Sequence, residues 1–396
     1  MHLEEIRALE KRYVMQTYGR NEIALVSGEG ARLRDSEGKE YIDLGSGIAV
    51  IGVSCLGYHH PALSAAISDQ AQKLMHCSNL FYSEPMAQVA EHLVKSTGLS
   101  RVFFANSGAE ANEAMIKTAR KYSSDRYGKD RYKIITLRQS FHGRTMTTLM
   151  ATGQDKFHQY FYPLPEGFAY VEAGDLAQFK SCADEHVCAV IMEMIQGEGG
   201  VLPLDQAFVQ EVSAYCKAHD ILVCVDEVQT GIGRTGTLFC YEQYGIEPDI
   251  VSMAKGLGGG VPIGAILCGE KCADTLQPGQ HGSTFGGNLL ACRAAQTVLS
   301  VVDQPQFLAS VKEKGEYIRE QLLAMHSPAI REVRGMGLML GIGVDPQKRS
   351  DYVRALQEKG VLVLTAGEDT IRLLPPLVIT KEDIDQALAC MKEVLK

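Results

Sequence analysis

The sequence predicts an α/β protein in which a large domain with a mainly parallel sheet is joined to a smaller α+β domain. From about residue 100 to 300, short apolar runs alternate with longer amphipathic runs. The short runs are rich in β-branched residues, as strands buried on both faces are. The runs between them have apolar residues at helical spacing, which is typical of helices that cover a sheet. The expected strands begin at Arg101, Lys133, Cys188, Ile221, Asp249 and Gly264.

The last third of the chain has a different pattern. Strands are expected from Glu332, Val361 and Thr370, with helices between and after them. Thr380 is the expected N-cap of the last helix, and Ser83 is the expected N-cap of an earlier one. These patterns predict a large domain over residues 50–300 and a small domain built from residues 1–49 and 301–396.

Composition excludes several classes of protein. The net charge of −9 over 396 residues argues against nucleic acid or an anionic membrane as the main partner. The 11 cysteines include no C-x-x-C pair, and the first residues are charged, unlike a secretory signal. No apolar run approaches the roughly 20 residues that span a bilayer. A cytoplasmic protein is therefore expected.

Two apolar strands end in residues that could carry chemistry. Asp226 ends VCVD, at the edge of an α/β sheet where ligands collect, although it could also be a solvated acid or a helix cap. Lys255 ends a second strand and is followed by a glycine-rich loop. Burying an unpaired ammonium is costly, which favours a covalent role for Lys255, whereas a side chain that reaches solvent is the simpler alternative.

Two further segments suit a phosphate. Ser107, Gly108 and Ala109 lie between an expected strand and a helix, where backbone N–H groups face bound anions, although Ser107 could simply cap the helix. Ser283 and Thr284 offer hydroxyls in a second glycine-rich loop.

The segment FHGRT could serve a flat cofactor and a carboxylate. Phe141 could stack on a ring and Arg144 could clamp a carboxylate, or the two could be a core residue and a surface residue. His59 and His60 have no partner at metal-ligand spacing, so no metal site is expected. No glycine loop matches the dinucleotide or P-loop pattern. Together, the anion site, acid, amine and arginine fit one cofactor class.

On these residues the chain resembles the class III aminotransferases of PLP fold type I, and closely the acetylornithine aminotransferases. The likeness runs almost from end to end, and its motifs keep the family's order and approximate spacing. The motifs are NSGAEANEA, FHGRT, QGEGG, VDEVQTGIGRTG, AKGLGGG and HGSTFGGN.

The resemblance implies pyridoxal 5'-phosphate as the cofactor. Lys255 would hold it covalently and move a proton, and Asp226 would keep its ring nitrogen protonated. The implied cofactor-binding residues are Ser107, Gly108, Ala109, Phe141, Asp226, Val228, Gln229, Lys255 and Thr284. Thr284 would reach the phosphate in a neighbouring subunit, which implies a homodimer with shared active sites.

The resemblance also implies four substrate-binding residues, which are Arg144, Glu198, Ser283 and Arg372. Arg144 resembles the clamp for the donor's α-carboxylate, and Arg372 the clamp for the α-carboxylate of glutamate or 2-oxoglutarate. Glu198 would pair with Arg372 whenever no carboxylate occupies that place.

The expected reaction moves the terminal amino group of N2-acetylornithine to 2-oxoglutarate, as in arginine biosynthesis. Ornithine aminotransferases usually have a Tyr where this chain has Ile48, which offers no hydrogen bond to a free α-amino group. An acylated donor is therefore preferred, and 4-aminobutyrate or another ω-amino acid is the alternative. The alternative classes are a nicotinamide dehydrogenase, a non-catalytic binding protein, and an aminomutase or racemase.

Three positions depart from the family's motifs. Tyr58 replaces the first His of LGH-x-HP, Met194 replaces Pro in EPIQGEGG, and Leu289 replaces Pro in GGNPLAC. None removes a reacting group, so the departures concern loop geometry.

Overall fold

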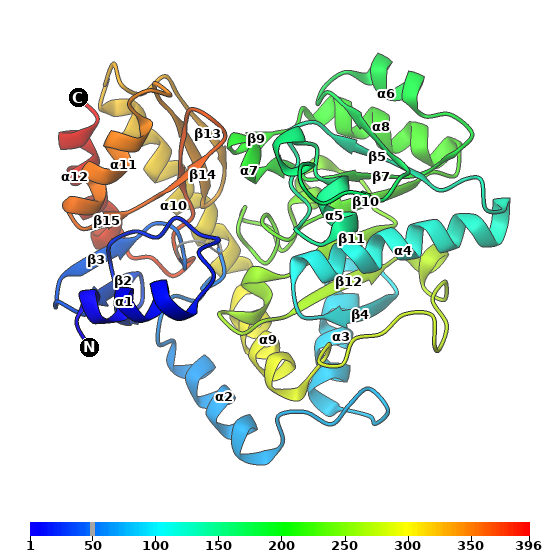
Figure 1. The fold of residues 1–396 in the computed structure, drawn as a ribbon, viewed down its shortest axis with the longest axis horizontal. Helices are drawn as coiled ribbons and strands as arrows, with labels where there is room; N and C mark the ends of the chain where they lie inside the picture. Colours follow the sequence, from blue (N-terminus) through cyan, green and yellow to red (C-terminus); the bar gives the residue numbers. More distant parts are fainter. Residues whose placement is uncertain (48–51) are drawn as a thin grey trace.

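A seven-stranded sheet dominates the computed structural model, which describes residues 1–47 and 52–396 (Figure 1). The strand order is β4-β12-β11-β10-β7-β5-β6. Neighbouring strands are parallel, except that β12 is antiparallel to both β11 and β4. The strands are β4 (Arg101–Ala105), β5 (Lys133–Leu137), β6 (Phe168–Val171), β7 (Val187–Met192), β10 (Leu222–Asp226), β11 (Ile250–Met253) and β12 (Gly264–Cys268).

The strands expected between residues 100 and 300 are all present, and the mainly parallel sheet is confirmed. Alternate residues of the central strands pack into different cores, which explains their continuous apolar runs. In β10, Leu222 shares a core with residues of α4 (Gly108–Tyr127), whereas Val223 shares one with residues of α8 (Gln206–Ala218). The edge strand β6 was not predicted. It has only four residues, and three of them are half-buried, so they form no continuous apolar run.

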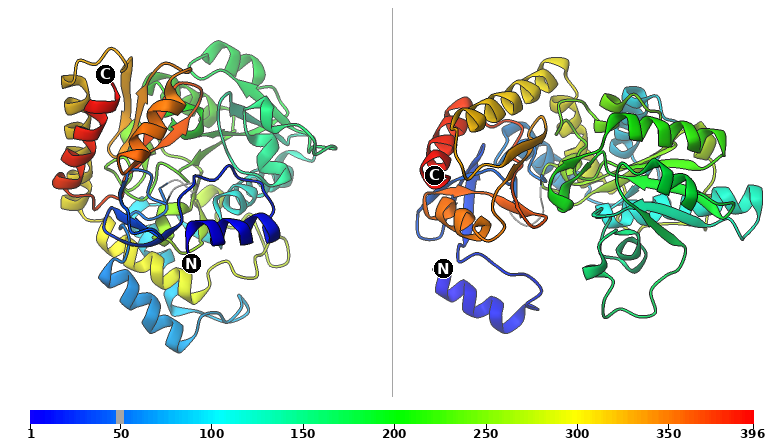
Figure 2. Two further views of the ribbon diagram at one scale, coloured as in Figure 1. Left: turned by 60° about the vertical axis from the view of Figure 1, so that its left-hand side comes forward. Right: turned by 90° about the horizontal axis from the view of Figure 1, so that it is seen from above.

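Two four-stranded sheets lie beside the large one, and the first of them combines N-terminal strands with a C-terminal strand, whereas the second is entirely C-terminal (Figures 1 and 2). Their orders are β1-β2-β3-β15 and β13-β14-β17-β16, and β15 is parallel to β3. The predicted boundaries between a large and a small domain remain a prediction. The strands are β1 (Leu25–Glu29), β2 (Arg32–Asp35), β3 (Glu40–Asp43), β13 (Glu332–Met336), β14 (Met339–Gly343), β15 (Val361–Leu362), β16 (Leu364–Ala366) and β17 (Thr370–Leu373).

Two strands expected in the tail differ from the prediction. The run from Glu332 is a hairpin, because Gly337 turns the chain with a φ of +52° between β13 and β14. The run from Val361 is divided between β15 and β16, which belong to different sheets. The strand from Thr370 is confirmed as β17.

The remaining helices surround these sheets, and Figure 2 shows α1 set apart from the rest of the fold. Thr380 caps α12 as predicted, since its Oγ1 accepts a hydrogen bond from the N–H of Asp383 at 3.1 Å. Ser83 precedes α3, but its buried hydroxyl makes no hydrogen bond within the described residues. The helices are α1 (Leu3–Tyr13), α2 (Pro61–Lys73), α3 (Glu84–Thr97), α5 (Met146–Ala151), α6 (Leu176–Cys182), α7 (Gly197–Gly200), α9 (Leu289–Val302), α10 (Pro305–Ala324), α11 (Arg349–Glu358) and α12 (Lys381–Val394).

Among the described residues, no helix combines the length and the apolar character needed to cross a bilayer.

Candidate active site

A cavity of about 660 Å³ lies where the parallel strands of the large sheet end. Its size is in the range of small-molecule sites. Because β4, β5, β7, β10 and β11 run in the same direction, the residues that follow them meet at one edge of the sheet. These strands contribute Asn106, Phe141, Glu193, Asp226 and Lys255 in turn to the cavity wall.

Asp226 is held rigidly at the end of β10. Its side chain is only 3% exposed, so it is not a solvated strand-end acid. Its Oδ2 accepts a hydrogen bond from Asn112 Nδ2 at 2.7 Å and lies 2.7 Å from His142 Nδ1, while its Oδ1 accepts one from the Val228 N–H at 3.0 Å. Three partners therefore fix the orientation of a carboxylate that lines the cavity.

His142 is a buried hydrogen-bond partner of this carboxylate. Burial by itself would lower the pKa of His142, but the hydrogen bond and charge of Asp226, with the charge of Glu193, raise that pKa overall. Burial raises the pKa of Glu193 to about 7, and the nearby charge of His142 partly opposes this rise. Two acids thus share one buried imidazole beside the cavity.

Lys255 lies two residues beyond the end of β11 and lines the same cavity. Its φ is +42°, a backbone conformation that costs free energy for a side-chain-bearing residue and that is found mainly where surrounding structure enforces it. Burial lowers the pKa of its amine, and the charge of Glu198 opposes this only in part. A lowered pKa increases the fraction of neutral amine, which is the nucleophilic form.

The first turn of α4 forms another part of the cavity wall. Ser107, Gly108 and Ala109 line it, and the helix dipole favours an anion at this end. The Ser107 hydroxyl caps the helix by accepting a hydrogen bond from the Glu110 N–H at 3.2 Å. The capping role and the lining role therefore coexist. A Cβ at Gly264 would come within 2.2 Å of the Ser107 carbonyl oxygen, so this glycine lets β12 approach the turn.

Arg372 and Glu198 form a buried ion pair. Arg372 Nη1 lies 2.8 Å from Glu198 Oε1, and the two side chains are 2% and 29% exposed. Arg372 also donates to the Gly197 carbonyl at 3.1 Å and to Gln229 Oε1 at 3.2 Å. Although burial raises it, the pKa of Glu198 is lowered overall, mainly by the charge and hydrogen bond of Arg372. Gln229 lines the cavity and so joins this pair to the site.

Phe141, Arg144 and Val228 also line the cavity. Phe141 is half-buried and its N–H donates to Glu193 Oε2 at 2.9 Å. Val228 packs against the start of α4, where a Cβ at Gly108 would come within 2.6 Å of its Cγ1. Arg144 is exposed, and its guanidinium carbon lies 5.5 Å from the centre of the Phe141 ring.

Four predicted residues lie outside this wall: Glu198 and Arg372, which reach it through Gln229, and Ser283 and Thr284. Ser283 Oγ accepts hydrogen bonds from Asn106 Nδ2 and the Gly286 N–H, both at 3.0 Å. Thr284 is exposed beside it. Within the described part of the chain, neither Ser283 nor Thr284 lines the cavity. Ile48, on which the donor argument depends, lies outside the described residues.

The departure at Tyr58 affects a loop of this site. Its hydroxyl donates to Asp43 Oδ2 at 2.5 Å. The Asp43 carboxylate also accepts hydrogen bonds from the N–H groups of Gly45 at 2.7 Å and Gly47 at 2.9 Å, and Gly47 lines the cavity. Tyr58 thus adds a third hydrogen bond to the buried carboxylate that holds the loop of Gly45 and Gly47.

Asn112, His142 and Glu193 were not predicted from the sequence to belong to the site. Glu193 carried a usable signal, because it is a lone acid in an otherwise apolar run. Asn112 lies in α4 among small buried residues, where its polarity was a weaker signal. The pairing of His142 with Asp226 joins residues 84 positions apart, so only the fold brings it about.

Comparisons with known proteins agree with this geometry. The family model described as aminotransferase class-III matches residues 13–395. The acetylornithine aminotransferase of Haemophilus ducreyi is 49% identical over 100% of this chain and 99% of its own length. That of Caldanaerobacter subterraneus is 50% identical over 98% of each chain.

Solved structures show the same fold. An ornithine aminotransferase from Toxoplasma gondii superposes with a TM-score of 0.95 at 32% identity, over 100% of this chain and 95% of that one. The N-acetylornithine aminotransferase from Stenotrophomonas maltophilia has a TM-score of 0.84 at 38% identity, over 98% of this chain and 97% of that one. The predicted fold class and the predicted family are both confirmed.

Proposed function

Because the chain belongs to the class III aminotransferases, we propose that it transfers the terminal amino group of N2-acetylornithine to 2-oxoglutarate. The products are the corresponding semialdehyde and glutamate. The observation that carries this proposal is an identity of 44–50% over nearly the whole chain with proteins named acetylornithine aminotransferase.

The cavity residues fit pyridoxal 5'-phosphate as the cofactor. When bound, this group supplies an aldehyde for the amino group and a ring that accepts electrons. Its phosphate would bind at the first turn of α4, and its ring would lie between Phe141 and Val228. The buried, triply hydrogen-bonded carboxylate of Asp226 suits a partner for a protonated ring nitrogen.

Lys255 would both hold the cofactor and transfer a proton on the substrate carbon. Its lowered pKa suits both tasks, because a neutral amine can form a covalent bond and can accept a proton. Asp226, His142 and Glu193 form a cluster of titratable groups in the cavity wall, in which the charges of the two acids raise the pKa of His142.

The Arg372–Glu198 pair suits an enzyme that takes two different substrates in turn. While the donor is bound, Glu198 neutralises Arg372, which would otherwise be a buried unpaired cation. When 2-oxoglutarate binds, its α-carboxylate replaces that of Glu198. The partial exposure of Glu198 gives its side chain room to withdraw. Arg144, at the exposed side, would bind the donor's α-carboxylate.

A comparison of donors tests the proposed function. The purified protein is supplied with pyridoxal 5'-phosphate and 2-oxoglutarate, and glutamate is measured with N-acetylornithine, ornithine or 4-aminobutyrate. We expect N-acetylornithine to exceed ornithine at least about tenfold in kcat/KM, which corresponds to roughly 1.4 kcal/mol. Equal use of ornithine would refute the argument from Ile48, and a preference for 4-aminobutyrate would favour the alternative donor.

The proposal includes a homodimer with shared active sites. Apolar side chains are exposed in residues 74–82, where Leu80 and Phe81 are 87% and 68% exposed, and in the loop of Thr284, where Phe285 is 58% exposed. The two segments are joined, because Asn79 Nδ2 donates to the carbonyls of Ser283 at 3.1 Å and Gly286 at 2.9 Å. An apolar surface of this kind is typical of an interface.

A mixing experiment tests the shared site. Lys255→Ala subunits are mixed with subunits that carry an inactivating substitution of Thr284, and the dimers that form are assayed. If Thr284 serves the partner's phosphate, the mixture should recover part of the activity that each variant lacks. Mixed dimers without recovery would count against sharing.

A further inference from the structure

Phe157 touches the proposed carboxylate clamp without belonging to the cavity wall. It ends the short 3-10 turn Asp155–Phe157, and its ring is half-buried. The guanidinium carbon of Arg144 lies 4.4 Å from the centre of this ring, closer than the 5.5 Å to Phe141. Phe157 is therefore the nearer of two aromatic platforms for Arg144.

The same ring connects the clamp to Phe141. The two phenyl rings meet edge to face, with centres 5.8 Å apart and planes at 72°. This is a favourable arrangement for two aromatic side chains. Arg144, Phe141 and Phe157 thus form one packed group, in which Phe157 supports both residues that line the cavity.

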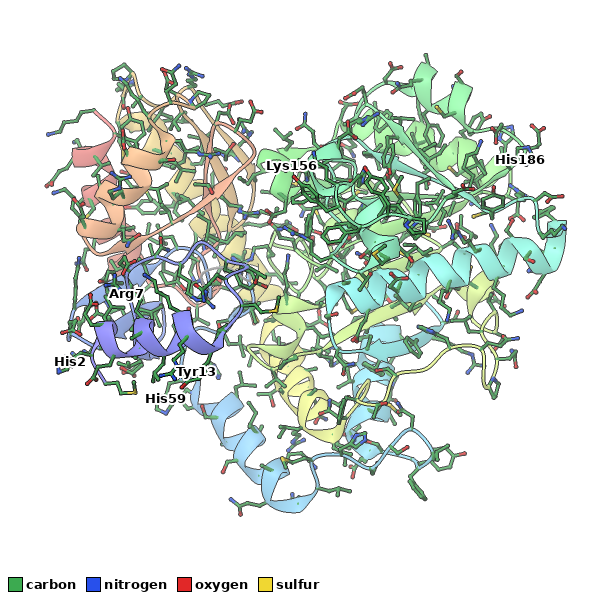
Figure 3. All side chains as sticks on the ribbon, viewed as in Figure 1. His2, Arg7, Tyr13, His59, Lys156 and His186 are labelled. Carbon is green, nitrogen blue, oxygen red and sulfur yellow. The ribbon has the colours of Figure 1, made fainter. Side chains whose placement is uncertain are left out.

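Lys156 places a second cation against the same ring. The ammonium of Lys156 lies 5.1 Å from the Phe157 ring centre. Figure 3 labels Lys156 at the edge of the large-sheet part that faces the two smaller sheets. Arg144 and Lys156 thus lie against one ring, while the neighbouring carboxylate of Asp155 pairs with Arg138.

An exposed arginine needs such support to discriminate between substrates. A free Arg side chain loses much rotamer freedom when it grips a carboxylate, which reduces the binding free energy. A ring under the guanidinium restricts that freedom before the substrate arrives, and it leaves the N–H groups in the guanidinium plane available to donate.

We propose that Phe157 is a positioning residue that holds Arg144 for the donor's α-carboxylate and thereby sets the preference for carboxylate-bearing donors. This inference rests on the proposed function, in which Arg144 binds that carboxylate. Phe157 acts through Arg144 and touches no reacting atom.

The test compares two donors that differ only in the carboxylate, N-acetylornithine and its decarboxylated analogue N-acetylputrescine. We expect Phe157→Leu to lower kcat/KM for N-acetylornithine about three- to tenfold, mostly through KM. The value for N-acetylputrescine should change less than about twofold. Phe157→Tyr keeps a ring and should restore the preference. In an Arg144→Leu background, Phe157→Leu should add no further loss for N-acetylornithine.

Tyr127→Leu is the matched control. It removes a ring that lies 4.2 Å from the guanidinium carbon of Arg131, far from the cavity residues, and it should change neither donor's kcat/KM. Equal losses for both donors with Phe157→Leu, or no loss for either, would overturn the inference. The wild-type protein tests the proposed function separately. If its kcat/KM shows no preference for N-acetylornithine over N-acetylputrescine, Arg144 does not bind the donor's α-carboxylate and both proposals are wrong.

Discussion

Replacing Glu198 with Gln should affect the two half-reactions in opposite directions. The substitution keeps the shape of the side chain and removes the charge that faces Arg372 at 2.8 Å. During the donor half-reaction, Arg372 would then be a buried cation whose remaining acceptors among the described residues are neutral, namely the carbonyls of Gly197 and Thr365 and the Gln229 amide oxygen. During the 2-oxoglutarate half-reaction, no carboxylate would need to be displaced from Arg372.

The magnitude follows from the burial of the pair. Breaking a fully buried ion pair costs about 3–5 kcal/mol. Glu198 is 29% exposed and neutral acceptors remain, so a cost of roughly 1–3 kcal/mol is expected here. The donor half-reaction should therefore slow by about 5- to 150-fold, while the 2-oxoglutarate half-reaction keeps or gains rate.

Single-turnover kinetics with each substrate alone would measure the two half-reactions separately. Glu91→Gln is a suitable control, because it removes an exposed ion pair with Lys95 on α3 and should alter neither rate. Equal slowing of both half-reactions by Glu198→Gln would refute the two-substrate argument. The Arg372–Glu198 ion pair should persist throughout assays from pH 6 to 9. Because its pKa is lowered, Glu198 stays ionised until the pH falls below the usual pKa of a glutamate.

Three further predictions concern the buried acids. Asp226→Asn should lower kcat by roughly two orders of magnitude or more, and a loss within about tenfold in steady-state assays would make the acid merely structural. Asn112→Leu removes one of three partners of Asp226 and should lower kcat by about tenfold, without the change in donor preference that a distorted substrate pocket would cause. Burial raises the pKa of Glu227 to about 7, so its contribution to stability is present below the usual glutamate pKa and is lost as pH rises through 7. Glu227→Gln should therefore raise the free energy of unfolding by roughly 1–3 kcal/mol at pH 8.5 and by little at pH 5, as urea denaturation would measure, and an equal effect at both pH values would contradict the assigned pKa.

The sequence predicted most of the large sheet, because its strands are buried on both faces and therefore read as continuous apolar runs. It predicted the tail less well. The hairpin at Gly337 depends on a positive φ that an apolar run does not reveal, and the division of Val361 from Leu364 depends on which strands pair.

The candidate site shows the same limit. Asp226 and Lys255 were recognisable because a charged group at the end of an apolar strand is costly unless it has a task. Asn112 and Phe157 were not recognised, because each acts through another residue. Only folding brings Asn112 to Asp226 and Phe157 to Arg144. Residues that support others are consequently less visible in a sequence than residues that react.

Every proposed role in this site depends on Lys255 as the residue that holds the cofactor. The most direct test is to supply the protein with pyridoxal 5'-phosphate, reduce it with borohydride, digest it and locate the modified peptide by mass spectrometry. We expect a pyridoxyl group on the peptide that contains Lys255, and its loss from Lys255→Ala protein that still binds the cofactor non-covalently. If a different lysine is modified in the wild-type protein, or if no lysine is modified, Lys255 does not hold the cofactor.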